Sequence, residues 1–107
     1  MNYSLNKSLK GEVVLSVTGV FERHETDDLR HQLKEFIDNG TKDIVVDLYS
    51  LHFLNSQLIA ILIALYNIVS TTNGTLKIIN VKPSLMSVFK SMRLDSRFQI
   101  ELIDDKD

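Results

Sequence analysis

The apolar residues of this chain follow two spacings, the two-residue period typical of strands and the three-to-four-residue period typical of helices. Short segments rich in β-branched and apolar residues predict strands at residues 2–9, 12–18, 43–48, 75–81 and 98–103. Longer segments with an apolar stripe predict helices at residues 27–38, 56–71 and 83–92. The predicted elements therefore follow one another in the order ββαβαβαβ.

This order predicts the fold class. Strand–helix–strand units form right-handed crossovers between parallel neighbours, with the helices packed on the sheet. The first two strands are joined by a short turn at Lys10-Gly11, which predicts a hairpin and an antiparallel edge. We expect a single α/β domain over residues 1–107, with a mixed, mostly parallel sheet of about five strands.

The helix boundaries are predicted from residues that commonly start and end helices. Thr26 is expected to cap the first helix, with Asp27 in its first turn, and Asn39-Gly40 to end it. Asn55 and Ser56 open the second helix, and Pro83 stands where a first helical turn tolerates proline.

Composition excludes several classes of function. The chain has 107 residues, a net charge of −2 with both signs interspersed, and no cysteine. No basic field is present, so we expect no nucleic-acid partner, and no disulfide or cysteine-based metal site is available. The three histidines, His24, His31 and His52, are too scattered to predict a metal site, and no glycine-rich loop predicts a bound nucleotide, so we expect no cofactor. The N-terminus lacks the apolar core of a signal peptide, and the longest apolar run is too short to cross a bilayer. We therefore expect a cytoplasmic protein that does not insert into a membrane.

The second helix is apolar over more than one face. One stripe is expected to face the sheet and comprises Ile59, Leu62, Ile63, Tyr66 and Val69. A second stripe comprises Leu58, Ile61, Leu65 and Ile68. Because a helix on the surface of a sheet buries one face, we expect part of the second stripe, Leu58, Ile61 and Leu65, to be exposed and to bind a partner protein. A homodimer through this helix is left open as one form of that contact.

Ser56 is the residue that points most directly to a function. Its hydroxyl is predicted to lie at a helix N-terminus, where free backbone N–H groups and the helix dipole favour negative charge. A phosphate there would add about −1.5 to −2 charges to a small surface. The G-x-S-x-G motif of a serine nucleophile is absent, so Ser56 is better suited to a regulatory switch than to catalysis. We therefore expect that the protein is not an enzyme.

Three motifs along the chain resemble those of the STAS family, the fold of sulphate transporters and anti-sigma factor antagonists. Gly19 with Glu22 is similar to the family's G-x-x-D turn. Residues 47–56, DLYSLHFLNS, are similar to D-h-x-x-h-x-x-h-D-S, where h is apolar. Residues 80–100, NVKPSLMSVFKSMRLDSRFQI, are similar to N-h-x-P-x-h-x-x-h-h-x-x-x-x-h-x-x-x-F-x-I. The ordered set covers nearly the whole chain.

The resemblance implies a function by binding. In the anti-sigma factor antagonist branch, a bacterial partner kinase that is also an anti-sigma factor phosphorylates the serine after the motif aspartate. The unphosphorylated protein binds that kinase and frees the sigma factor, so transcription is regulated by partner switching. Ser56 occupies the serine position, and Asn55 and Glu22 occupy the two acidic positions near it.

The chain departs from the family pattern around this serine. The family reads D-S-S/T-G-L-G, whereas residues 55–60 read N-S-Q-L-I-A, with Gln57 and Leu58 in place of a small hydroxyl residue and a glycine. An alternative function is therefore kept open: a STAS scaffold subunit that works without phosphorylation, associated with a membrane transporter or forming a homodimer.

Overall fold

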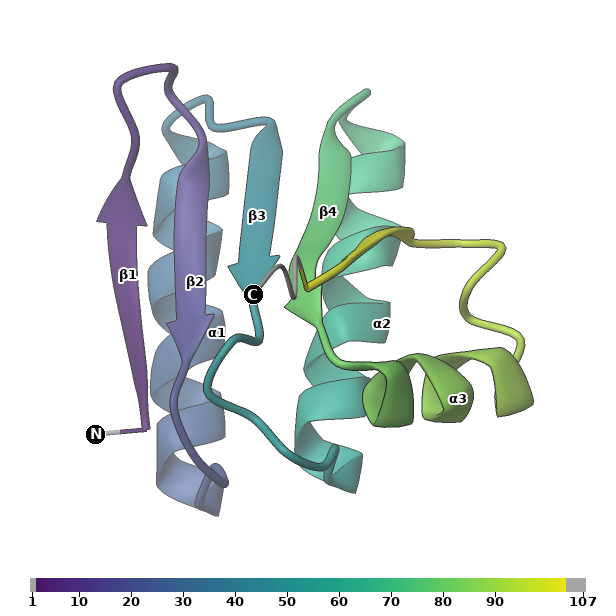
Figure 1. The fold of residues 1–107 in the computed structure, drawn as a ribbon. Coiled ribbons are helices and arrows are strands. Elements are labelled where there is room, and N and C mark those ends of the chain that lie inside the picture. Colours follow the sequence, from purple (N-terminus) through teal and green to yellow (C-terminus); the bar gives the residue numbers. More distant parts are fainter. Residues whose placement is uncertain (1, 104–107) are drawn as a thin grey trace.

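The sheet has five strands in the spatial order β1-β2-β3-β4-β5, as seen in a computed structural model that describes residues 2–103 (Figure 1). The strands are β1 Tyr3–Lys7, β2 Val13–Val17, β3 Asp43–Asp47, β4 Thr75–Val81 and β5 Gln99–Leu102. The helices are α1 Arg23–Asp38, α2 Ser56–Thr71 and α3 Pro83–Ser91. Strands β1 and β2 pair antiparallel and all other neighbours pair parallel. The predicted fold class and element order are confirmed.

The two faces of the sheet differ in what covers them. Helices α1 and α2 lie side by side behind the sheet in Figure 1, and α3 lies beyond the end of β4. The strand residues that point toward α1 and α2 are buried, as the pattern of β2 shows at Val13, Leu15 and Val17. The opposite face carries polar pairs, including an ion pair of 2.7 Å between Lys77 and Glu101. The core therefore lies between one face of the sheet and the helices.

Helix α2 is buried differently from the expectation. Leu58, Ile61 and Leu65 are only 2%, 1% and 3% exposed, so the prediction that they form an exposed partner surface is wrong. They share the fully buried side of α2 with Leu62 and Val69, and at 3.6 residues per turn these five residues span an arc of about 100°. The buried face of α2 therefore lies between the two predicted stripes and takes residues from both. Ile61 and Leu65 also line the groove between α2 and α1, together with Leu33.

The other flank of α2 meets the C-terminal part of the domain. The ring of Tyr66 packs edge-on against Phe98, with centroids 5.8 Å apart, and Phe98 in turn packs against Phe89 of α3 at 6.1 Å. Tyr66, Ile59 and Ile63, which were expected to face the sheet, are half-buried, while Ile68 is exposed. Apolar residues all round α2 are thus largely explained by neighbours on three sides. No helix among residues 2–103 is long and apolar enough to span a membrane.

Helix α1 begins three residues before the expected cap. Glu22 is the N-cap residue, and Thr26 is a buried residue of the first turns rather than the cap. The carboxylate of Glu25 accepts a hydrogen bond of 3.1 Å from the backbone N–H of Glu22, which satisfies one of the free donors at the helix start. Glu22 and Glu25 therefore form a capping box at the start of this helix.

Substitution of Leu65 by glutamate tests the revised position of α2. Leu65→Glu removes a packed side chain and places a charge between α1 and α2, so the free energy of unfolding should fall by at least about 3 kcal/mol in urea titrations. Asn67→Glu, on an exposed position of the same helix, should change it by less than about 0.5 kcal/mol. Equal stability of the two variants would show that Leu65 is exposed after all.

Candidate functional site

Ser56 is the first residue of α2 and its side chain is exposed. The side-chain oxygen of the N-cap residue, Asn55, accepts a hydrogen bond of 2.9 Å from the backbone N–H of Leu58. The expected helix start is therefore confirmed, with Asn55 as its cap. The serine hydroxyl lies at a helix N-terminus, where a negative group is electrostatically favoured.

The loop from residue 48 to residue 55, which leads to Ser56, is held by two polar side chains. Asp47 at the end of β3 accepts hydrogen bonds from the backbone N–H of Tyr49, at 2.9 Å, and from the side-chain amide of Asn80, at 3.0 Å. Asp47 therefore ties the start of the loop to β4 and has a structural role at the end of β3.

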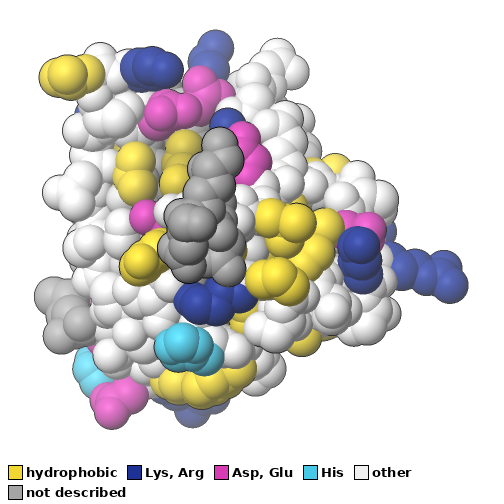
Figure 2. Space-filling model, viewed as in Figure 1, with side chains coloured by type: hydrophobic (Ala, Val, Ile, Leu, Met, Phe, Trp, Pro, Cys, Tyr) yellow, Lys and Arg dark blue, Asp and Glu magenta, His cyan; other side chains and the backbone are white. Residues whose placement is uncertain are grey.

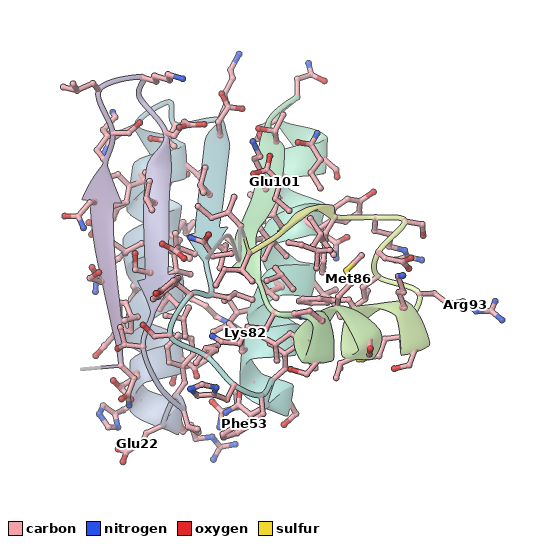
Figure 3. All side chains as sticks on the ribbon, viewed as in Figure 1. Glu22, Phe53, Lys82, Met86, Arg93 and Glu101 are labelled. Carbon is pink, nitrogen blue, oxygen red and sulfur yellow. The ribbon has the colours of Figure 1, made fainter. Side chains whose placement is uncertain are left out.

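Lys82 anchors the middle of the same loop. It follows β4, and its Nζ donates hydrogen bonds to the backbone carbonyls of Tyr49 and Leu51, the latter at 2.8 Å. The ammonium group also lies 5.7 Å from the centre of the Tyr49 ring, within cation–π range. Figure 3 shows Lys82 lying over the loop below the end of β4. Sequence reasoning missed this residue, because it stands at a variable position of the N-h-x-P motif.

Large apolar side chains are exposed at the edge of the sheet where β2, β3 and β4 end, here called the carboxyl edge. Tyr49 is 62% exposed, Phe53 60% and Val20, in the loop after β2, 48%. Figure 2 shows hydrophobic side chains along the lower rim of the molecule, and Figure 3 places Phe53 there. The alternation within residues 47–56 explains this: apolar motif positions such as Leu48 and Leu51 are buried, and the variable positions between them point outward.

Glu22 lies at the same edge but not in contact with Ser56. It precedes α1, whereas Ser56 follows β3, and β2 and β3 are parallel neighbours whose following loops are adjacent. A shallow pocket of about 230 Å³ between these strand ends is lined by residues of both, including Thr18 and Tyr49. The Glu22 carboxylate lies 3.5 Å from Nδ1 of His24, in an exposed pair that contributes little stability.

Gln57 has a structural contact that its sequence position did not reveal. Its side-chain oxygen is hydrogen-bonded to the hydroxyl of Thr26 in α1. The bond joins the first turns of α1 and α2 and leaves Gln57 half-buried. Of the residues predicted near Ser56, Asn55 caps its helix, Gln57 fixes that helix to α1, and Glu22 stands apart on the neighbouring loop.

The sequence of the chain matches one protein family over nearly its whole length. The family model described as "Mlab, STAS domain" matches residues 5–104. The chain belongs to the STAS family. The resemblance inferred from the three motifs is therefore confirmed.

Solved structures share the fold of this STAS domain at low sequence identity. Bacillus SpoIIAA in its phosphorylated form has a TM-score of 0.75 and 18% identity, covering 92% of this chain and 89% of that one. A serine-to-glutamate variant of RsbS from Moorella thermoacetica has a TM-score of 0.79 and 15% identity, covering 97% and 88%. An anti-sigma factor antagonist from Mycobacterium paratuberculosis has a TM-score of 0.74 and 21% identity, covering 92% and 83%. Anti-sigma factor antagonists of this family are regulatory binding proteins, not enzymes.

One buried carboxylate of the STAS domain has a strongly shifted pKa. Glu25 is 7% exposed and accepts hydrogen bonds from the backbone N–H of Asn2 at 3.0 Å, from that of Glu22, and from the side-chain amide of Asn2 at 2.9 Å. These donors favour the ionised form and lower the pKa of Glu25 from 4.5 to about 2. The carboxylate joins the residue before β1 to the start of α1, next to the carboxyl edge.

The lowered pKa of Glu25 predicts how the stability of the domain changes at acidic pH. A carboxylate with a lowered folded-state pKa stabilises the fold above about pH 4.5, and this contribution is lost as the pH falls toward 2. Glu25→Gln should therefore be less stable than the unsubstituted domain at pH 7, and the difference should shrink in thermal scans between pH 4.5 and 2. Glu35→Gln, on an exposed position of α1, is the matched control and should follow the unsubstituted curve.

Removal of the Lys82 ammonium group tests the anchoring of the loop. Lys82→Met leaves two carbonyls without their charged donor, so the free energy of unfolding should fall by about 1–2 kcal/mol. In Lys82→Met, amide hydrogen exchange in residues 49–55 should become faster than in the unsubstituted domain, by a larger factor than in the core strands. Lys90→Met, an exposed lysine of α3, should alter neither. Unchanged loop exchange in Lys82→Met would mean that the loop is held by its buried leucines alone.

Proposed function

We propose that this STAS domain is an anti-sigma factor antagonist that binds an anti-sigma factor carrying a serine-kinase ATPase domain, and that phosphorylation of Ser56 regulates this binding. The observation that carries the proposal is the exposed hydroxyl of Ser56 at the start of α2, at the serine position of the family motif. Its exposure leaves it accessible to a kinase, and the helix N-terminus accommodates the charge of a phosphate.

The partner docks on the carboxyl edge in this proposal, and the apolar side of α2 takes no part in it. Val20, Tyr49 and Phe53 supply large exposed side chains there, and aromatic residues are common anchors of protein interfaces. Lys82 and Asp47 hold the loop that carries the two aromatic residues, so little ordering entropy is lost on binding.

Phosphorylation would act on this surface by charge. A phosphoserine at position 56 adds about −1.5 to −2 charges beside apolar side chains that must lose water on docking. The helix N-terminus stabilises the phosphate in the free domain, so the fold is retained while docking is opposed. Glu22 on the adjacent loop already contributes negative charge to the same edge.

The alternative is a STAS scaffold subunit that binds constitutively, in a transporter-associated complex or a homodimer. Two observations favour it. Asn55 replaces the motif carboxylate and serves as a helix cap, and Gln57 is engaged with Thr26 in joining two helices. Both residues are explained by structure without a phosphorylation event. In this alternative Ser56 is an ordinary first residue of a helix.

Two variants of Ser56 separate these functions. The partner is first captured from native cells with the tagged protein, identified by mass spectrometry and purified. Ser56→Asp should then bind it at least about ten-fold more weakly, about 1.4 kcal/mol, because negative charge is placed in the interface. Ser56→Ala should bind normally and should not be phosphorylated by a kinase partner.

Ser84→Asp is the matched control, since Ser84 is an exposed serine in the first turn of α3. It should leave the affinity unchanged. Equal affinities of Ser56→Asp and the unsubstituted domain would contradict the switch and support the scaffold function.

A further inference from the structure

A continuous valley runs between α1 and α2 on the side of the domain away from the sheet. Both helices follow parallel strands, so they run in the same direction and their N-termini lie at the same end (Figure 1). Two cavities occupy this valley, a polar cleft of about 360 Å³ and an apolar groove of about 390 Å³. Each volume is within the range of small-molecule sites.

The two cavities are consecutive along the helices. The polar cleft is lined by Arg23, Thr26, Asp27, Arg30, Gln57 and Ala60. The apolar groove has the lining side chains Leu33, Ile37, Ile61, Ala64, Leu65 and Ile68. Arg30 lines both cavities and stands where one meets the other. From Gln57 to Ile68 the valley extends about 16 Å, at 1.5 Å of helix rise per residue.

Positive charge is concentrated at the polar end. Arg23 and Arg30 face one carboxylate, Asp27, and both helix dipoles add positive potential there. Neither arginine forms a salt bridge within the part of the chain that the structure describes. The groove has Lys34 and, at its far end, Asp38 on the α1 side, while α2 carries no charged residue along its whole length.

We propose that this valley binds a single-chain anionic amphiphile, with its acidic group in the polar cleft between Arg23 and Arg30 and its hydrocarbon chain in the groove. Two arginines stand at one end of the valley, whereas the groove carries one lysine and one aspartate on its α1 side and only uncharged residues on its α2 side, which matches a negatively charged head with an apolar tail. The groove floor is preformed, because Leu33, Ile61 and Leu65 are already buried in the core. The polar cleft begins at Gln57, next to Ser56, and the groove continues along the helices toward their C-terminal ends. The proposal is argued from these lining residues and does not rest on the proposed partner switch.

Calorimetric titration of the full chain with dodecanoate, below its micelle concentration, tests the proposal. Saturable binding of one molecule is expected, and the neutral analogue dodecanol should bind at least ten-fold more weakly. Arg30→Gln should lower dodecanoate affinity at least ten-fold. Arg97→Gln, an exposed arginine after α3, should leave it unchanged. Both positions are exposed, so thermal scans should show that both variants remain folded.

A second variant and a second readout locate the site. Ala64→Leu fills the groove from a half-buried position and should reduce the affinity of dodecanoate while α1 and α2 remain packed. Amide chemical shifts on titration should change along α1 and α2 and not in residues 49–55.

Several results would overturn the proposal. They are the absence of saturable binding, equal affinity in Arg30→Gln, and shift changes confined to the loops. A dimer by light scattering that covers Ala64 and Ile68 would assign the valley to a second copy of the chain. Co-sedimentation with anionic phospholipid vesicles without dodecanoate binding would assign it to a membrane surface. None of these results bears on the response of partner affinity to Ser56→Asp, so the two proposals fail separately.

Discussion

The rest of the structure depends on the burial of α2 between the sheet, α1 and Phe98, which follows α3 in the chain. This helix has no charged residue, and Leu58, Ile61 and Leu65 are buried in the core while Tyr66 packs on Phe98. Apolar burial on three sides makes α2 the element that joins the N-terminal and C-terminal parts of the domain. The position of its first residue, Ser56, is consequently fixed by the core and not by local contacts alone.

The loop before α2 is fixed by a second, polar set of contacts. Asp47 and Lys82 satisfy backbone groups that a loop would otherwise leave to water, and each residue comes from the end of a core strand or just after it. The buried leucines of the same loop add apolar contacts beneath it. As a result Tyr49 and Phe53 remain exposed on a loop that is held in place. A preformed surface of this kind suits binding, because little of the loop has to be ordered on docking.

The STAS family provides the fold, and the side chains decide how the domain uses it. The three solved structures described above have 15–21% identity to this chain. They share its architecture, but at this identity its surface residues have to be interpreted from the chain itself. Two such surfaces are distinct in chemistry: the carboxyl edge with exposed aromatic side chains around a helix-start serine, and the valley between α1 and α2 with arginines at one end. We propose a protein partner for the first and a small anionic molecule with an apolar chain for the second.

The sequence by itself determined the element order, the hairpin edge, the mostly parallel sheet and the start of α2 at Asn55-Ser56, because periodicity and helix caps are local signals. It did not determine which side of α2 is buried, because every side is apolar and the neighbours of a helix are set by topology. It also missed Glu25 at the start of α1, since the residue's donors come largely from Asn2, far away in the chain. Lys82 and the meeting of Arg23, Arg30 and Gln57 were likewise decided only by tertiary structure. Contacts between residues distant in sequence depend on how strands and helices are brought together, and no local pattern records them.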